Sequence, residues 1–208
     1  NLLDTWHVSG MKASGSGHFE VQDLFVPESM TCDPFAPRTG DHPLLRFPLF
    51  GALGIGIGAV ALGLAGATLR EFTHLAGSKT PQGSSRPLAL KSATQRRVAL
   101  ARATLDAARL LFYHAIEQAW AAVSEGGEAS LAQRADLRLA NSYAVQQATE
   151  VVDSLYTLAG GSSVYLNSPL QRYFRDIHVA TQHMMINETS LELVGRVALG
   201  VETNTAQL

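Results

Sequence analysis

Apolar and polar residues alternate near the start of the chain and then follow a helical spacing over the rest of it. In residues 18–27, HFEVQDLFVP, apolar side chains recur at nearly every second position, which predicts β-strands within residues 1–30. Residues 31–46 are predicted to form a linker, because proline recurs in them. These prolines are Pro34, Pro37 and Pro43. The front of the chain is therefore expected to be the end of a β-domain.

Apolar residues with a period of about 3.6 predict four helices in the remainder of the chain. They are expected at residues 44–77, 88–123, 130–159 and from Pro169 to about Gly200. Short breaks that contain glycine or proline separate them, as in an antiparallel bundle. The expected fold class is thus mainly α, with a four-helix up-down bundle at residues 47–208 after the truncated β-domain and the linker.

The first of these helices contains an uncharged stretch, residues 47–69, that is long enough to cross a bilayer. Gly54 and Gly58 have the small-xxx-small spacing found where helices meet in membranes. The stretch is built largely from glycine and alanine, however, and no lysine or arginine cluster flanks it to set an orientation. We therefore predict a helix buried by other helices or subunits, and no membrane partner.

Composition excludes several classes of protein. Apolar residues make up 46% and charged residues 16% of the 208 residues, and the net charge is −2. No basic stripe is present, so the electrostatic footprint of nucleic-acid binding is missing. The single Cys32 excludes an intramolecular disulfide and is compatible with the cytoplasm, where we expect the protein. No metal site is predicted, and the start at Asn1, without methionine or signal peptide, leads us to expect a fragment.

The segment GGSSVYLNSPLQRYFRD, residues 160–176, contains two adjacent glycines, a proline and an arginine-rich run. This order resembles the C-terminal signature of the acyl-CoA dehydrogenase superfamily. The stretch WHVSGMKASGSGHFEVQDLFVP, residues 6–27, is similar to the closing strands of the central β-barrel of that superfamily. The resemblance covers essentially the whole chain. It implies the end of a β-barrel domain followed by the superfamily's C-terminal four-helix bundle.

The chain departs from the dehydrogenases of this superfamily at their catalytic base. Their glutamate lies nine positions after the arginine of the Arg-Asp pair, and counting nine from Arg175 gives Met184, which cannot take a proton. Arg196 matches a family arginine further along the last helix and supports this alignment. Glu188 lies four residues after the lost position. A dehydrogenase would therefore need Glu188 as a displaced base.

His183 directly precedes the lost glutamate position. One branch of the superfamily, the two-component flavin-dependent monooxygenases, lacks the glutamate and has a histidine near the flavin ring. The resemblance implies that His183 is the catalytic residue, which either hydrogen-bonds the flavin or deprotonates a phenol. It also implies a small aromatic substrate and reduced flavin from a separate flavin reductase. A packed core histidine is the open alternative for His183, and His178, without a counterpart in the motif, is interpreted as structural.

Two further departures bear on the type of flavin. Dehydrogenases hold the dinucleotide of FAD with an R-x-x-F-G run and with a glutamine before the paired glycines. The corresponding positions here are Pro81, Ser84-Ser85 and Thr157, which favours reduced FMN over FAD. The candidates for binding the cofactor are Gly160, Gly161, Ser162, Met184, Ser78, Lys79 and Arg86. The glycine pair is expected to serve the flavin of a neighbouring subunit, and a solvated loop is the alternative for the last three residues.

Substrate contacts are expected from the front of the chain, where the resemblance points to Trp6, Met11, Ser14 and Ser16. Trp6 would stack on an aromatic ring, and a core position is its alternative. The superfamily assembles its bundles into tetramers, so we expect a homotetramer or at least a dimer, which would also cover the apolar first helix. Two other functions stay open: an acyl-CoA dehydrogenase that uses Glu188, and a non-catalytic oligomerising bundle.

Overall fold

The computed structural model describes residues 1–33, 36 and 40–208. Its long helices are α2 (Leu49–Ser78), α3 (Ser92–Ser124) and α4 (Leu131–Ala159). The shorter helices are α1 (Pro43–Arg46), α5 (Pro169–Ala180) and α6 (Glu188–Ala198). The 3-10 turns are η1 (Lys12–Ser14), η2 (Glu28–Met30), η3 (Leu88–Leu90), η4 (Gly160–Ser163) and η5 (Met184–Ile186). The described chain is therefore mainly α-helical, as predicted.

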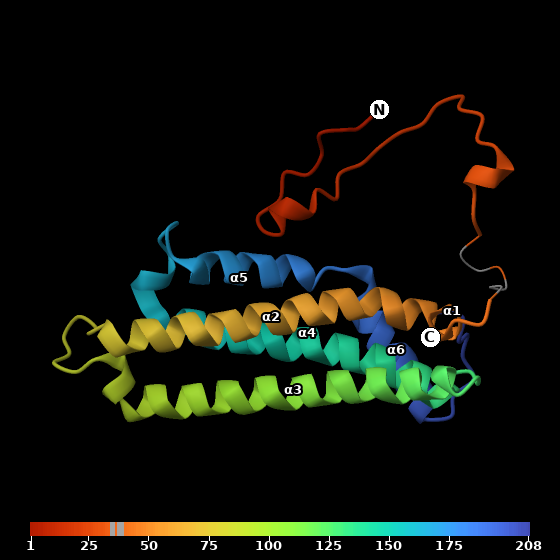
Figure 1. Ribbon diagram of the computed structural model, residues 1–208. Helices are drawn as coiled ribbons and strands as arrows, with labels where there is room; N and C mark the ends of the chain where they lie inside the picture. The colour runs from red at the N-terminus through yellow and green to blue at the C-terminus, as the bar shows by residue number, and fades with distance from the viewer. Residues whose placement is uncertain (34–35, 37–39) are drawn as a thin grey trace.

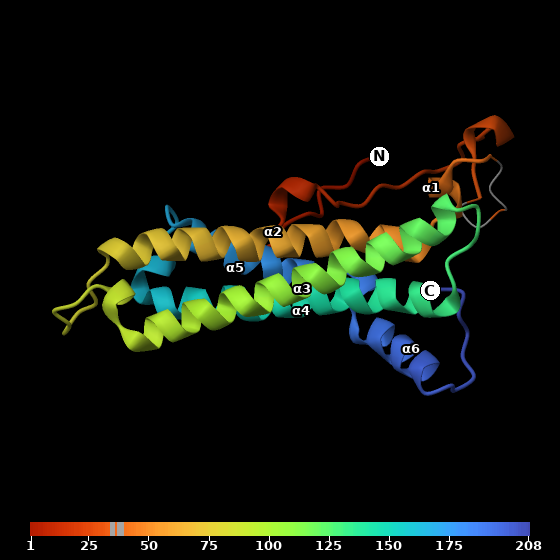
Figure 2. The same ribbon diagram turned by 60° about the horizontal axis from the view of Figure 1, so that its bottom comes forward.

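Helices α2 to α5 lie side by side, and each runs in the opposite direction to the one before it (Figure 1). α4 is the central element, since it packs against α2, α3, α5 and α6. Phe72, Phe112 and Leu155 are fully buried in a core that is otherwise rich in alanine. Figure 2 shows α6 leaving the bundle at an angle beside one end of α4. The predicted helical bundle is confirmed, with α6 as an element outside its four antiparallel helices.

Glycines allow α2 to pack closely against its neighbours. A Cβ at Gly54 would lie 2.8 Å from Nδ2 of Asn141, and a Cβ at Gly58 would lie 2.5 Å from Cε2 of Phe112. Asn141 also donates a hydrogen bond to the carbonyl of Gly51 at 3.3 Å. The small-xxx-small spacing therefore serves helix contacts inside the bundle, where small residues allow close approach.

One helix of the described residues, α2, is long and apolar enough to cross a membrane by length and composition alone. Only 39% of its most apolar window is buried inside the chain. Leu53 and Val60 are 51% and 42% exposed. The predicted burial is therefore found on the face toward α4, while other apolar residues of α2 are left uncovered by the described part of the chain.

Replacing Gly58 with alanine is expected to lower the free energy of unfolding by about 1–3 kcal/mol, because the added methyl group overpacks the contact with Phe112. The matched control is Gly77→Ala in the same helix, where an added Cβ meets nothing within 4 Å. This control is expected to leave the free energy of unfolding unchanged or to raise it by up to about 1 kcal/mol, because alanine has a higher helix propensity than glycine. Urea unfolding measures both values, and equal midpoints for the two variants would contradict the close packing of α2.

The prediction of β-strands within residues 1–30 is wrong, because the described residues contain no β-strand. One isolated antiparallel bridge joins Leu2 to Phe19, and Phe25 is 85% exposed. A strand requires ladder partners for its backbone N–H and C=O groups, and this segment finds only that bridge in the described chain. Of the linker prolines, Pro43 begins α1. The other linker prolines, Pro34 and Pro37, lie outside the described residues.

The fourth predicted helix is interrupted, so the expectation of a single element from Pro169 onward is also wrong. Polar side chains between α5 and α6 bond to the nearby backbone. Thr181 Oγ1 donates to a carbonyl in the last turn of α5 at 2.7 Å, and Asn187 Oδ1 accepts from the N–H of Ser190 at 3.2 Å. Such local bonds compete with those of a continuous helix. His183 lies in the resulting break.

Candidate active site

His183 caps the η5 turn at the break between α5 and α6. Its Nδ1 accepts a hydrogen bond from the N–H of Met185 at 3.2 Å. A neutral imidazole that accepts at Nδ1 carries its proton on Nε2. The side chain is exposed, and no hydrogen bond from Nε2 forms within the described chain. Within the described residues His183 is therefore not packed in the core, and its geometry is that of a hydrogen-bond donor at Nε2.

The residues after His183 hold this segment on the bundle. Met185 and Ile186 are buried in the main core. Met184, at the position of the dehydrogenase glutamate, is 67% exposed. The position of the lost base is therefore on the surface next to His183, where a bound molecule can reach both residues.

A loop near the N-terminus docks on the middle of α5 through the Arg-Asp pair of the sequence motif (Figure 1). Asp176 Oδ1 accepts from the N–H of Met11 at 2.6 Å, and Arg175 Nη1 donates to the carbonyl of Ser9 at 2.7 Å. Between these bonds Gly10 is buried, and a Cβ there would lie 2.4 Å from the carbonyl oxygen of Arg175. Only glycine fits this contact. Sequence reasoning used the Arg-Asp pair for alignment and missed this docking role, since the two segments lie far apart in the chain.

All four predicted substrate residues meet at this loop. Trp6 Nε1 and Ser14 Oγ donate to the carbonyl of Met11 at 3.3 and 2.8 Å. Ser16 Oγ donates to Ser14 Oγ at 3.1 Å. A cavity of about 430 Å³ lies beside this loop, with Met11, Ser14 and Arg172 in its lining, whereas Trp6 and Ser16 do not line it. Its volume is within the range of small-molecule sites.

The paired glycines lie at the other end of α5. Gly160 ends α4 with a φ of 57°, a conformation that favours glycine. Lys79 Nζ donates to the carbonyl of Ala159, where its charge also complements the negative end of the α4 dipole. An added Cβ at Gly161 would meet nothing within 4 Å. The structure thus brings Lys79 together with the glycine pair, two groups that the sequence analysis treated separately.

The other predicted cofactor residues make fewer contacts. Ser78 Oγ donates to the carbonyl of Leu75 at 3.3 Å. Ser162 is half-buried and Arg86 is exposed, and neither side chain forms a hydrogen bond within the described residues. The glycine pair and His183 are separated by the 12 residues of α5, which span about 18 Å. One chain therefore does not bring these two groups to the same point.

His178 belongs to a stack of aromatic rings between α4 and α5. The ring centroid of Phe174 lies 4.4 Å from that of Tyr156 and 4.4 Å from that of His178. His178 Nδ1 donates to the carbonyl of Phe174 at 2.7 Å, and its Nε2 lies 3.5 Å from Asp153 Oδ1. Burial raises the pKa of the Asp153 carboxyl, and the nearby His178 partly offsets that rise. These contacts agree with the structural interpretation of His178.

Glu188 is exposed at the first residue of α6. An acidic residue in the first turn is favourable for the helix dipole. Because of the break, Glu188 is no longer one helical turn from Met184 on a continuous helix. Within the described ranges, no group of three or more His, Cys, Asp or Glu side chains is arranged to hold a metal ion.

Sequence comparison relates the chain to flavin enzymes. The family described as acyl-CoA dehydrogenase, C-terminal domain, matches residues 55–188. The chain is 30% identical to the indole-3-acetate monooxygenase of Acinetobacter baumannii over 198 residues, which are 95% of this chain and 51% of that protein. It is 27% identical to the oxygenase component of the FADH2-dependent resorcinol hydroxylase of a Rhizobium species, over 97% of this chain and 54% of that protein. The chain thus spans about half the length of the curated relatives it matches.

Solved structures share the arrangement of the helices. XiaF from Streptomyces, in complex with FADH2 and glycerol, matches with a TM-score of 0.90 and 26% identity over 97% of this chain and 53% of that chain. Butyryl-CoA dehydrogenase from Megasphaera elsdenii matches with a TM-score of 0.62 and 25% identity over 72% of this chain and 37% of that chain. The relatives include oxygenase components of flavin-dependent monooxygenases, as the sequence analysis predicted. The chain therefore belongs to the acyl-CoA dehydrogenase family and matches its C-terminal domain.

Proposed function

We propose that the protein is the oxygenase component of a two-component flavin-dependent monooxygenase, to which this chain contributes the helical bundle. It hydroxylates a small aromatic substrate in the cytoplasm, with O2 and with reduced flavin from a separate flavin reductase. Relatives are named for indole-3-acetate and resorcinol, which supports an aromatic ring as the group that is oxidised.

The observation that carries this proposal is the geometry of His183. Its Nδ1 is engaged by the N–H of Met185, so the proton of the neutral ring lies on Nε2. To remove a proton, Nε2 must itself be unprotonated, which places the proton of the neutral ring on Nδ1. That proton would then face the N–H of Met185, and the hydrogen bond between them would be lost. The geometry therefore supports hydrogen-bond donation from Nε2 to an oxygen or nitrogen of the flavin or the substrate, rather than general-base catalysis.

The described residues fit parts of a flavin site. Open space at Gly161 leaves the backbone accessible to a phosphate, and Lys79 Nζ adds a positive charge next to it. The docked loop of Trp6, Met11 and Ser14 positions a substrate at the cavity beside α5. Reduced flavin, when bound, supplies the oxygen chemistry, and the protein orients the reactants and excludes water.

The preference for FMN, drawn from Pro81 and Thr157, has no support among the relatives. The resorcinol hydroxylase is named as FADH2-dependent, and XiaF was solved with FADH2. We therefore propose reduced flavin as the cofactor without restriction to FMN. Equilibrium binding of reduced FMN and reduced FAD under anaerobic conditions distinguishes the two.

The test of the proposed function supplies the intact protein with a flavin reductase, NADH, flavin, O2 and a set of aromatic substrates. Hydroxylated product, detected by mass spectrometry, is the expected result. A parallel reaction supplies acyl-CoA substrates and an artificial electron acceptor. Turnover in the second reaction alone would show that the protein is a dehydrogenase. No activity in either reaction, together with no flavin binding, would show that it is a non-catalytic bundle.

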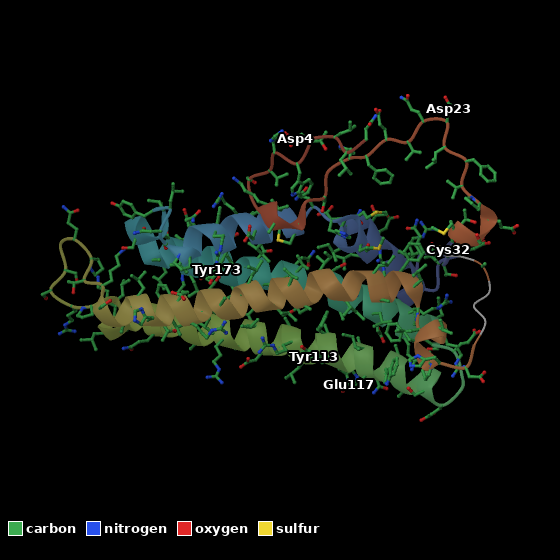
Figure 3. The ribbon with its side chains drawn as sticks, turned by 45° about the horizontal axis from the view of Figure 1, so that its top comes forward. Asp4, Asp23, Cys32, Tyr113, Glu117 and Tyr173 are labelled. Carbon is green, nitrogen blue, oxygen red and sulfur yellow. The ribbon has the colours of Figure 1, made fainter. Side chains whose placement is uncertain are left out.

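We further propose a homotetramer, or at least a dimer. Exposed apolar residues on the long helices include Leu53, Val60, Leu110, Tyr113 and Trp120, and Figure 3 shows Tyr113 and Glu117 along α3. Since α5 separates the glycine pair from His183 within one chain, the pair is free to serve the flavin of another subunit. Light scattering at micromolar concentration is expected to give a multiple of the monomer mass, and a monomeric mass would contradict the proposal.

A further inference from the structure

A second cavity lies between α4, α6 and the C-terminal residues 203–207. It has a volume of about 480 Å³ and shares no lining residue with the cavity beside Met11. The lining residues that matter here are Arg138, Met184, Asn187, Glu192, Leu193 and Arg196. The cavity therefore combines two guanidinium groups with apolar side chains, and it adjoins the residue that follows His183.

Arg138 is a buried cation at this cavity. It is 3% exposed. Its Nη2 donates to Ser190 Oγ at 2.6 Å, and its Nη1 lies 3.3 Å from Met185 Sδ and 3.4 Å from the carbonyl oxygen of Phe50. Its Nε is buried and has no hydrogen-bond partner among the described residues. No carboxylate of the described residues lies within ion-pair distance of it, so its charge is uncompensated.

Arg196 adds a second positive charge to the cavity lining. Its Nη1 lies 3.9 Å from Glu192 Oε1, and its Nη2 donates to the carbonyl of Glu202 at 2.8 Å. Its Nε finds no partner in the described part of the chain. Glu192 can balance one of the two arginines, which leaves the lining with a net positive charge. Burial lowers the pKa of Arg138, yet a guanidinium remains protonated in proteins. Because a buried unpaired charge is costly, an anion in this cavity would supply a missing counter-charge.

We propose that this cavity binds the carboxylate of a small organic acid, with Arg138 as the principal ligand and Arg196 as the second. Arg138 Nη2 keeps one N–H beyond its bond to Ser190, so Arg138 and Arg196 together donate charge-assisted hydrogen bonds to the carboxylate oxygens. Met184 and Leu193 provide apolar contacts for the body of the acid. The volume is within the range of small-molecule sites. Since the two cavities share no lining residue, this acid is a second ligand, separate from the molecule bound beside Met11.

The test uses benzoate and benzamide as a matched pair of probes on the intact protein, by calorimetry and by thermal unfolding. Benzoate is expected to bind and to raise the melting temperature, whereas neutral benzamide of similar shape is expected to bind at least about tenfold more weakly. Arg138→Met, which removes the charge and keeps an unbranched side chain, is expected to weaken benzoate binding by about 10- to 100-fold. Equal binding of the two probes, or unchanged benzoate binding to Arg138→Met, would overturn the proposal.

Two further variants complete the experiment. Arg102→Gln removes an exposed charge from α3 and is expected to leave benzoate binding unchanged. Arg196→Gln alters a half-exposed side chain and carries the test if Arg138→Met does not fold; a loss of at least about threefold supports the site, and no loss overturns it. A crystal structure of the intact protein that shows an acidic side chain against Arg138 would also overturn the proposal, because the counter-charge would then be internal to the protein. None of these readouts requires hydroxylase activity.

Discussion

Replacing His183 with alanine is expected to lower aromatic hydroxylation by about 100- to 10,000-fold, the range typical of a lost acid–base or positioning group. The variant removes the donor at Nε2 and also the cap on the N–H of Met185. Reduced flavin is still expected to bind, about twofold to tenfold more weakly, because one hydrogen bond is lost. Its oxidation is then expected to release hydrogen peroxide in place of hydroxylated product. Product formation and peroxide release are measured in the same reaction.

Two conservative variants separate the donor role from the capping role of His183. Asparagine offers an acceptor close to the position of Nδ1, and it is a good N-cap residue, but it has no group at the position of Nε2. Glutamine can place a donor near Nε2. His183→Asn is therefore expected to remain as impaired as the alanine variant, while His183→Gln recovers part of the activity. The reverse order would show that capping, rather than hydrogen-bond donation, is the role of His183.

Glu188→Gln is the control for the same experiment, because it is expected to have little effect on hydroxylation. The carboxylate is exposed at the start of α6 and is interpreted here as a favourable charge for the helix dipole. For a dehydrogenase with a displaced base the pattern is reversed: Glu188→Gln abolishes turnover and His183→Ala is tolerated. If flavin oxidation stays coupled to product formation in both His183→Ala and Glu188→Gln, the hypothesis that His183 is the catalytic residue is wrong.

Replacing Gly10 with alanine is expected to lower hydroxylation by about 100-fold, with a much smaller change in the unfolding of the bundle. The added Cβ would lie 2.4 Å from the carbonyl oxygen of Arg175, so the loop must leave its place on α5. The cluster of Trp6, Met11 and Ser14 moves with it, and a displacement of about 1 Å at reacting groups can cost about 100-fold in rate.

Gly195→Ala is the matched control for Gly10→Ala, because an added Cβ at Gly195 in α6 meets nothing within 4 Å. This control is expected to keep its activity. Asp176→Asn tests the same docking contact without a clash, since it weakens the 2.6 Å bond to the N–H of Met11. Asp176→Asn is expected to lower hydroxylation as well, but by less than Gly10→Ala does. Full activity of both Gly10→Ala and Asp176→Asn would show that the loop does not position the substrate.

The long helices were predictable because their stabilising signals are local. Apolar periodicity and terminal glycine or proline residues placed α3 and α4 within a few residues of their observed ends. The break before α6 also has a local cause, the capping side chains of His183 and Asn187. It was not predicted because the apolar pattern on either side of it is that of a continuous helix. The strands failed because pairing depends on residues distant in the chain, which alternation alone does not provide.

The site was predictable only in part, for the same reason. Family resemblance proposed His183 and the residues at the front of the chain as site residues. In the structure Trp6 and Ser14 both bond to the carbonyl of Met11, and Ser16 bonds to Ser14. The docking role of Asp176 and the buried charge of Arg138 depend on contacts between distant segments. No local pattern in the sequence marks an arginine in α4 as lacking an acidic partner.

The packing of α2 has a consequence for the order in which the chain folds as it is synthesised. α2 packs mainly against α4 and only slightly against α3, the helix that follows it on the chain. The ends of α2 and α4 are about 80 residues apart, which corresponds to roughly 4–16 s of translation. During this interval a 30-residue helix with the hydropathy of a membrane span has left the ribosome without its main partner. A nascent chain that stalls before α4 emerges is therefore the form most exposed to capture by chaperones or by the membrane-insertion machinery.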